Sequence, residues 1–106
     1  MKNFSKAAIV LGAIVIANTS FAAKGVVVHY PGGCDYYIVE TNMGYVLLEW
    51  YGGSDPREGD ALVGDFEAYG MKTIFNLTQD SETRVWVEDY WLDEESVIEN
   101  FYEQCG

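Results

Sequence analysis

The sequence predicts a mainly β domain, a small antiparallel barrel or strongly curved sheet of about six strands with one C-terminal amphipathic helix. Three observations predict this fold class. Short runs rich in β-branched and aromatic residues follow one another along most of the chain. Short segments containing Gly, Asn, Asp or Pro separate them, which favours sequential hairpins. Apolar residues take up helical spacing only near the C-terminus.

The N-terminal segment has the pattern of a secretory signal peptide. Lys2 and Lys6 give a positive start, an apolar run follows, and small residues precede a predicted cleavage after Ala22. The apolar run is about 11 residues long, whereas a transmembrane anchor, the alternative reading, needs about 20. We therefore expect residues 1–22 to be cleaved and residues 23–106 to form one domain, periplasmic or secreted, in a bacterium.

The charge of the chain narrows the class of partner. The full sequence has 6 Lys and Arg against 17 Asp and Glu. Removal of residues 1–22 takes away two of the basic residues and no acidic one, which leaves four against 17, formally −13. So few cations argue against binding to nucleic acid or to an anionic membrane surface. We expect a basic protein partner instead.

Three β runs occupy the first half of the domain. The run 26–30 is stopped by a Pro-Gly-Gly sequence, and the runs 36–41 and 45–51 are joined by an Asn-Met-Gly turn. The second run has no charged residue before Glu40. We therefore expect it to be buried on both faces, with the barrel core beneath it and the helix above it.

Three further runs complete the predicted barrel. The run 61–69 follows a loop rich in Gly, Asp and Pro, the run 73–77 follows a Gly-Met turn, and the run 83–88 follows a polar hairpin loop. Gly64 within the fourth run predicts the sharp bend that a small barrel needs. The architecture is similar in outline to SH3-like or OB-like barrels, and no motif places the chain in a named family.

A helix is predicted over residues 93–105. Asp93 is a suitable N-cap, and two glutamates follow it in the first turn, where the helix dipole favours acidic side chains. Apolar residues at helical spacing form one stripe that we expect to be buried, namely Val97, Ile98, Phe101, Tyr102 and Cys105.

The two cysteines, Cys34 and Cys105, are predicted to form a structural disulfide. Both lie in the exported part, and an oxidising compartment favours their pairing. A redox pair usually has the spacing Cys-x-x-Cys, and a zinc site needs about four ligands. The chain has one histidine, His29, and no third cysteine. We therefore expect no metal and no cofactor.

The alternation of side chains along the strands predicts a candidate binding surface. The outward positions combine aromatic rings with charged groups, as recognition surfaces do. They also fit a simpler interpretation, in which the rings cover the barrel and pair across strands while the carboxylates keep the protein soluble. The predicted binding residues are Tyr51, Tyr69, Trp86, Tyr90, Glu49, Asp65, Glu67, Arg84 and Glu88.

Catalytic chemistry is not expected. His29 lies in an apolar run, and no Gly-rich phosphate loop joins a strand to a helix. A pair of carboxylates could hydrolyse a glycoside, but that reaction needs a deep cleft, which a domain of this size hardly provides. The acidic loop 55–60 could bind calcium weakly, yet its spacing does not match the twelve-residue calcium loop.

The sequence leaves three functions open. The first is an inhibitor- or immunity-like module that binds a basic envelope or secreted protein through the acidic aromatic surface. The second is a small-ligand or glycan-binding periplasmic module, which requires the aromatic rings to form one platform. The third is a structural accessory with no separate ligand.

Overall fold

Two three-stranded meanders make up the β domain. The computed structural model describes residues 22–106, so the predicted signal peptide, Ala22 apart, lies outside the described residues. Each meander contains three consecutive antiparallel strands joined by short hairpins or loops. The strands are β1 Ala23–His29, β2 Tyr36–Thr41, β3 Gly44–Gly53, β4 Ala61–Gly64, β5 Gly70–Asn76 and β6 Ser81–Leu92.

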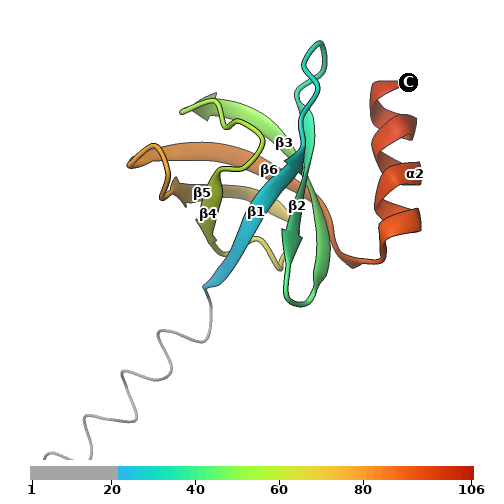
Figure 1. Ribbon diagram of the computed structural model, residues 1–106, viewed down its shortest axis with the longest axis horizontal. Coiled ribbons are helices and arrows are strands. Elements are labelled where there is room, and N and C mark those ends of the chain that lie inside the picture. The colour runs from blue at the N-terminus through green and yellow to red at the C-terminus, as the bar shows by residue number, and fades with distance from the viewer. Residues whose placement is uncertain (1–21) are drawn as a thin grey trace, which may run out of the picture.

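Pairing between the two meanders closes the barrel. β3 pairs with β6 and β1 pairs with β4, both antiparallel, so the strand order around the barrel is β1-β2-β3-β6-β5-β4 (Figure 1). Each of the six described strands therefore has a partner on both sides, and within residues 22–106 no long edge is left open for pairing with another chain. The predicted antiparallel barrel is confirmed, in its closed form.

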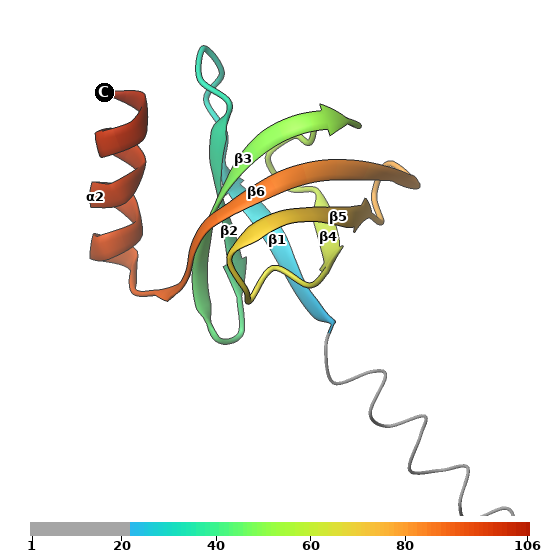
Figure 2. The same ribbon diagram turned by 180° about the vertical axis from the view of Figure 1, so that it is seen from behind.

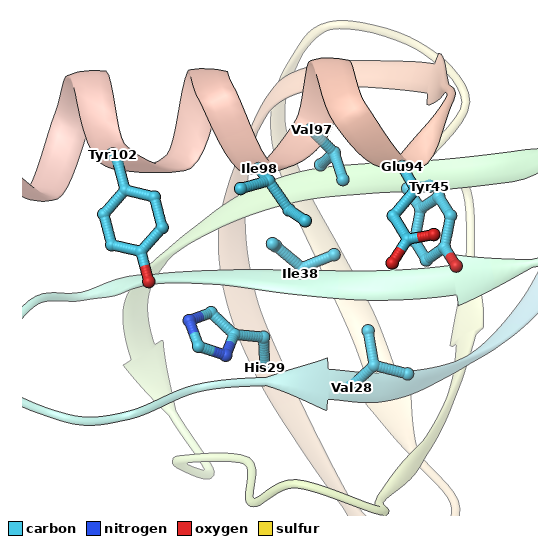
Figure 3. A pocket seen from close by; sticks show the side chains of 8 residues that line it. All are labelled: Val28, His29, Ile38, Tyr45, Glu94, Val97, Ile98 and Tyr102. Carbon is cyan, nitrogen blue, oxygen red and sulfur yellow. The ribbon is translucent and has the colours of Figure 1, made fainter.

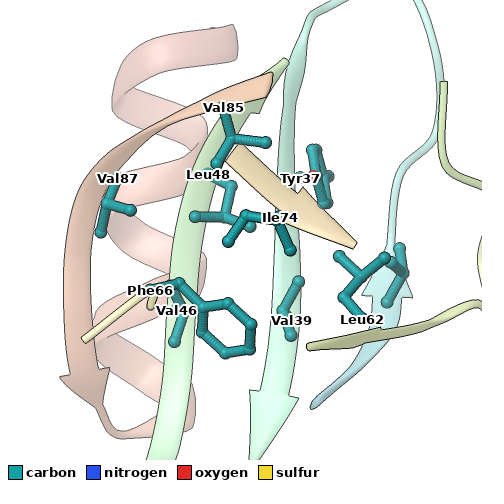
Figure 4. Packing of buried hydrophobic residues seen from close by; sticks show 10 residues of the cluster. Tyr37, Val39, Val46, Leu48, Leu62, Phe66, Ile74, Val85 and Val87 are labelled. Atoms are coloured by element: carbon teal, nitrogen blue, oxygen red, sulfur yellow. The ribbon is translucent and has the colours of Figure 1, made fainter. Parts of the chain in front are cut away.

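The barrel interior is filled by side chains from all six strands (Figure 4). Alternate residues of each strand point inward, as the pleat requires. Tyr37 and Val39 of β2 contribute to this inner core, and Phe66, from the loop after β4, closes one end of it. The fully buried members are Val27, Tyr37, Val39, Val46, Leu48, Leu62, Phe66, Ile74, Val85 and Val87.

A second core lies on the outside of the barrel, under helix α2, Glu94–Cys105. Ile38 of β2 and Leu47 of β3 are buried there against Val97 and Phe101 of the helix. Burial of each of these helix side chains stabilises the fold by about 2 kcal/mol. β2 is thus buried on both faces, as its sequence predicts. Figure 2 shows α2 running alongside β2 and β3 on the outside of the barrel.

α2 is fastened at both ends. At its start, the Asp93 carboxylate accepts a hydrogen bond of 2.8 Å from the backbone N–H of Ser96, which confirms the predicted N-cap. At its end, Cys105 is bridged to Cys34, with the two Cα atoms 5.9 Å apart, which confirms the predicted disulfide. Within residues 22–106, no helix is long and apolar enough to cross a membrane.

The predicted helical stripe is only partly buried. Val97 and Phe101 are almost fully buried, but Ile98 and Tyr102 are 43% and 55% exposed. The helix packs over β2 and β3 rather than centrally over the barrel, and on the side that faces β1 only the His29 ring approaches it, with centroids 4.8 Å from Phe101 and 6.4 Å from Tyr102. The prediction that the whole stripe is buried is therefore wrong for these two residues.

Several strand boundaries also differ from the prediction. β1 begins at Ala23 rather than at residue 26, and β5 begins at Gly70, so Gly70 and Met71, the residues of a predicted turn, lie within the strand. β4 ends at Gly64 rather than at residue 69, because the chain leaves the sheet there and crosses the end of the barrel as a loop. A Cβ atom on Gly64 would lie 3.0 Å from Ile74 Cδ1, so the absence of a side chain lets β5 approach closely. β6 continues to Leu92, well beyond residue 88, because it pairs with the full length of β3.

The bridge is expected to contribute a large share of the stability. It closes a loop across a sequence separation of 71 residues, and loop-closure entropy predicts a loss of about 4 kcal/mol when it is removed. The double variant Cys34→Ser/Cys105→Ser should therefore melt at least ~15 °C below the oxidised protein. Thermal unfolding followed by circular dichroism measures this, and equal melting temperatures would contradict the structural role of the bridge.

Candidate functional site

The strand register brings part of the predicted surface together on the outside of β3 and β6. Trp86 of β6 lies opposite Glu49 of β3 on one side and opposite Met71 of β5 on the other. Glu49 in turn lies opposite Tyr36 of β2. These four side chains form one row across four strands, because cross-strand neighbours on the same face of a sheet lie within contact distance.

Three more predicted residues flank this row. Arg84 and Glu88 lie two positions before and after Trp86 on β6, and Tyr51 lies two positions after Glu49 on β3. Tyr51 is 55% exposed and Trp86 is 38% exposed, so both rings are accessible. We call this surface the β3–β6 face, and it comprises Tyr36, Glu49, Tyr51, Met71, Arg84, Trp86 and Glu88.

The β3–β6 face is acidic and partly organised. Partial burial, a hydrogen bond to the Glu49 carboxylate and the charges of Glu49 and Glu88 raise the pKa of Tyr36 to about 12. The Tyr36 hydroxyl therefore lies within electrostatic reach of the Glu49 and Glu88 carboxylates. Two carboxylates beside an exposed indole ring are suited to hold a Lys or Arg side chain.

Tyr69 and Tyr90 belong to a different part of the surface, at one end of the barrel. Their rings lie 4.9 Å apart, and the Tyr69 hydroxyl donates to the Asp89 carboxylate over 3.2 Å. Tyr90 is half-buried and packs against the barrel core, so its predicted outward orientation is wrong. The cause is a bulge in β6, where Glu88 is an extra residue between the partners of Leu47 and Leu48 and reverses the alternation.

The two remaining predicted acids also lie away from the β3–β6 face. Asp65 forms an ion pair of 3.4 Å with Lys72 beside the barrel-end loop. Glu67 lines a shallow depression between that loop and the hairpin that joins β2 and β3. Tyr69, Tyr90, Asp65 and Glu67 therefore do not add to one continuous aromatic platform with Trp86.

The acidic loop 55–60 is stabilised by internal hydrogen bonds rather than left open for an ion. Asp60 is 4% exposed, and its Oδ2 accepts from Asn76 at 2.9 Å, from Gln79 at 2.7 Å and from the backbone N–H of Arg57 at 3.0 Å. Asp55 accepts a hydrogen bond of 2.9 Å from the Tyr30 hydroxyl. Among residues 22–106, no three His, Cys, Asp or Glu side chains are placed to hold a metal ion.

The structure adds a surface that the sequence reading missed, a groove between α2 and β1 with a volume of about 260 Å³. A signal for it is present, because Val26 and Val28 alternate with the buried Val27 and must point out of the barrel. We call it the α2–β1 groove, and it is lined by Val28, His29, Ile38, Tyr45, Glu94, Val97, Ile98 and Tyr102 (Figure 3).

Comparison of the chain with protein-family models, with curated proteins and with solved structures finds no match. Function is therefore inferred from the side chains of the β3–β6 face and the α2–β1 groove.

The Asp60 carboxylate predicts a pH dependence of stability. Burial raises the pKa of Asp60, but the hydrogen bonds from Asn76, Gln79 and Arg57 outweigh this effect and lower it below its usual value. A carboxyl group with a lowered pKa in the folded state stabilises the fold above the unfolded pKa of about 3.9, and this contribution is lost as the pH falls through the folded pKa. Asp60→Asn should therefore destabilise the protein by about 2 kcal/mol at pH 7, and by much less at acidic pH.

Urea unfolding of both proteins at neutral pH and near pH 2.5 measures this difference. Asp65→Asn is the matched control, because its ion pair is exposed and should be worth less than about 1 kcal/mol. A loss for Asp60→Asn that is the same at both pH values would contradict the role given to the charged carboxylate.

Proposed function

We propose that the chain is an exported, disulfide-tied acidic β-barrel that binds a basic envelope or secreted protein, as an inhibitor- or immunity-like module does. The observation that carries this proposal is the β3–β6 face. Trp86 and Tyr51 are exposed there between Glu49 and Glu88, with Arg84 as the one basic side chain of the face. Exposed aromatic anchors ringed by charge are characteristic of protein-recognition surfaces.

The net charge supports a cationic partner. After removal of residues 1–22 the chain carries formally −13, and its four cations are spread over β1, the 54–60 loop, β5 and β6. A field of this sign accelerates encounters with a positively charged protein and slows encounters with another acidic one. We therefore expect association to be fast at low salt and to slow down as salt is added.

The residues of the β3–β6 face have different expected roles in binding a partner. Trp86 lies at the middle of the row across four strands, where an indole ring can be fully desolvated by a partner. Glu49 and Glu88 lie beside it and can pair with Lys or Arg at the rim. The rigid barrel beneath keeps these groups in place, which lowers the entropy lost on binding.

The disulfide supports export. Structural bridges form and persist in oxidising compartments such as the bacterial periplasm and are rare in the cytosol. The bond between Cys34 and Cys105 therefore agrees with the predicted signal peptide over residues 1–22. A periplasmic or secreted location is part of the proposal.

The glycan-binding alternative receives less support from the geometry. It requires the four predicted aromatic residues to form one platform, and Tyr90 packs against the barrel core. Tyr69 contacts Tyr90 at the barrel end, whereas Trp86 lies on the sheet. The one indole of the β3–β6 face, with acidic neighbours, is better suited to a basic side chain than to a sugar ring.

Capture from an envelope extract tests the proposal. The immobilised exported protein should retain one or more basic proteins at about 0.1 M salt and release them near 1 M, where charges are screened within about 3 Å. Trp86→Ala should weaken the retained complex by about tenfold or more, as loss of an aromatic anchor does. Glu49→Gln/Glu88→Gln should lower the association rate and its salt dependence.

Trp91→Ala is the matched control, because Trp91 is 57% exposed but lies outside the β3–β6 face. It should leave the captured complex unchanged. The proposal is wrong if no basic protein is retained at low salt, or if Trp86→Ala and Trp91→Ala retain the same protein equally well.

A further inference from the structure

The α2–β1 groove has a floor and two walls of different origin (Figure 3). Ile38 of β2 forms the floor, Val97, Ile98 and Tyr102 of α2 form one wall, and Val28 and His29 of β1 form the other. The helix is held on β2 and β3 by its buried side chains and at its end by the bridge to Cys34. The groove is therefore a permanent feature of the fold.

The accessible lining of the groove is mostly apolar. Val28 is 40% exposed and Ile98 is 43% exposed, and they lie on opposite sides of Ile38, offset from each other along the groove (Figure 3). Clusters of exposed apolar side chains with a polar rim are characteristic of binding sites on soluble domains. Burial of Val28 and Ile98 by a partner would contribute favourable free energy of binding, because it removes apolar surface from water.

One end of the groove is acidic. Glu94, at the start of α2, lies next to Tyr45 of β3, and Glu40 of β2 lies opposite Tyr45 in the strand register (Figure 3). Partial desolvation and the charges of Glu40 and Glu94 raise the pKa of Tyr45, which places both carboxylates within electrostatic reach of its hydroxyl. Glu95 follows in the same helical turn.

The size of the groove indicates the kind of occupant. Its volume of about 260 Å³ lies below the about 300 to 1,000 Å³ that a drug-sized ligand occupies. It is sufficient for one or two large side chains of a protein, which is how interface anchors are usually held. An apolar side chain would contact Val28 and Ile98, and a neighbouring cation would reach Glu94.

We propose that the α2–β1 groove is a second binding site of the barrel, which takes a short basic segment of the partner protein with one large apolar side chain beside Lys or Arg. This inference rests on the proposed function in that the partner is basic, but it uses a surface distinct from the β3–β6 face. The apolar side chain lies between Val28 and Ile98, and the cation pairs with Glu94 and Glu40.

Charge complementarity selects this occupant over a second copy of the same chain. Each copy carries formally −13 after removal of residues 1–22, so two copies joined at the groove would bring acidic helix starts together. Like charges in close contact oppose association, whereas a Lys or Arg beside the apolar anchor neutralises the acidic end.

Nuclear magnetic resonance with a defined peptide tests the inference. The ¹⁵N-labelled protein is exported with its own leader, purified from the periplasm with the bridge formed, and titrated with the capped tripeptide Lys-Trp-Lys. We expect saturable amide shifts at Val28, His29 and Ile98, with Kd in the range of about 1 mM that a single anchor provides. The capped peptides Lys-Ala-Lys and Glu-Trp-Glu should cause no saturable shifts at these positions.

A pair of variants on one strand distinguishes the groove from nonspecific attraction. Val28→Gln should weaken binding of Lys-Trp-Lys about fivefold or more, because it removes one apolar wall. Val26→Gln is the matched control, since Val26 is 41% exposed on the same face of β1 and lies outside the groove. Glu94→Gln should weaken binding about threefold, and more at low salt than at high salt.

The outcomes separate this inference from the proposed function. Shifts at the groove that Val28→Gln weakens and Val26→Gln does not support the inference. Saturable shifts only at Tyr51 and Trp86 overturn it and support the β3–β6 face as the basic-partner site. The absence of saturable shifts anywhere overturns the groove as a site, while the capture experiment with Trp86→Ala decides the proposed function by itself.

Discussion

The attachment of α2 to the outside of β2 and β3 is the constraint on which the other surface features depend. The helix begins at the Asp93 cap, directly after β6, and ends at the bridge to Cys34, directly before β2. Between these two points, Val97 and Phe101 are buried against Ile38 and Leu47. A 12-residue helix fixed at both ends and packed in the middle has no freedom to slide towards β1.

This attachment divides the outside of the barrel into three regions. β2 is covered by α2. Side chains on one face of β2 belong to the inner core, and Ile38 on the other face belongs to the outer core. β1, on one side of the helix, leaves Val26 and Val28 accessible and forms a wall of the groove. β3 and β6, on the other side, carry the exposed row around Trp86. Two dissimilar surfaces thus flank one helix.

The acidic residues of the chain have two kinds of role. Asp60 and Asp93 accept hydrogen bonds from backbone N–H groups or from buried amides and stabilise a loop and a helix start. The Asp60 charge is satisfied inside the fold, whereas the exposed Asp93 carboxylate is engaged by the helix start, so neither is readily available to a partner. Glu49, Glu88 and Glu94 lie on the two surfaces with aromatic or aliphatic neighbours, and these carboxylates are the ones that a cationic partner can reach.

Features of the fold that depend on local patterns could be predicted from the sequence. The strand runs, the Asp93 cap and the double burial of β2 follow from the spacing of apolar and turn residues. The bridge follows from there being only two cysteines in the exported part. Five of the seven residues of the β3–β6 face could also be predicted, because alternation along the strands places Glu49, Tyr51, Arg84, Trp86 and Glu88 on outward faces.

The rest depends on which strands become neighbours. Tyr90 turns inward because β6 must insert an extra residue at Glu88 to stay paired with β3, and a bulge of this kind has no signal within one strand. Ile98 and Tyr102 belong to an apolar stripe, yet they remain exposed because the bridge and the outer core hold α2 over β2 and β3. The sequence by itself determined the barrel class, the helix and the acidity. Only the tertiary structure decided where the aromatic and apolar groups meet, because contacts between strands distant in sequence depend on register and closure.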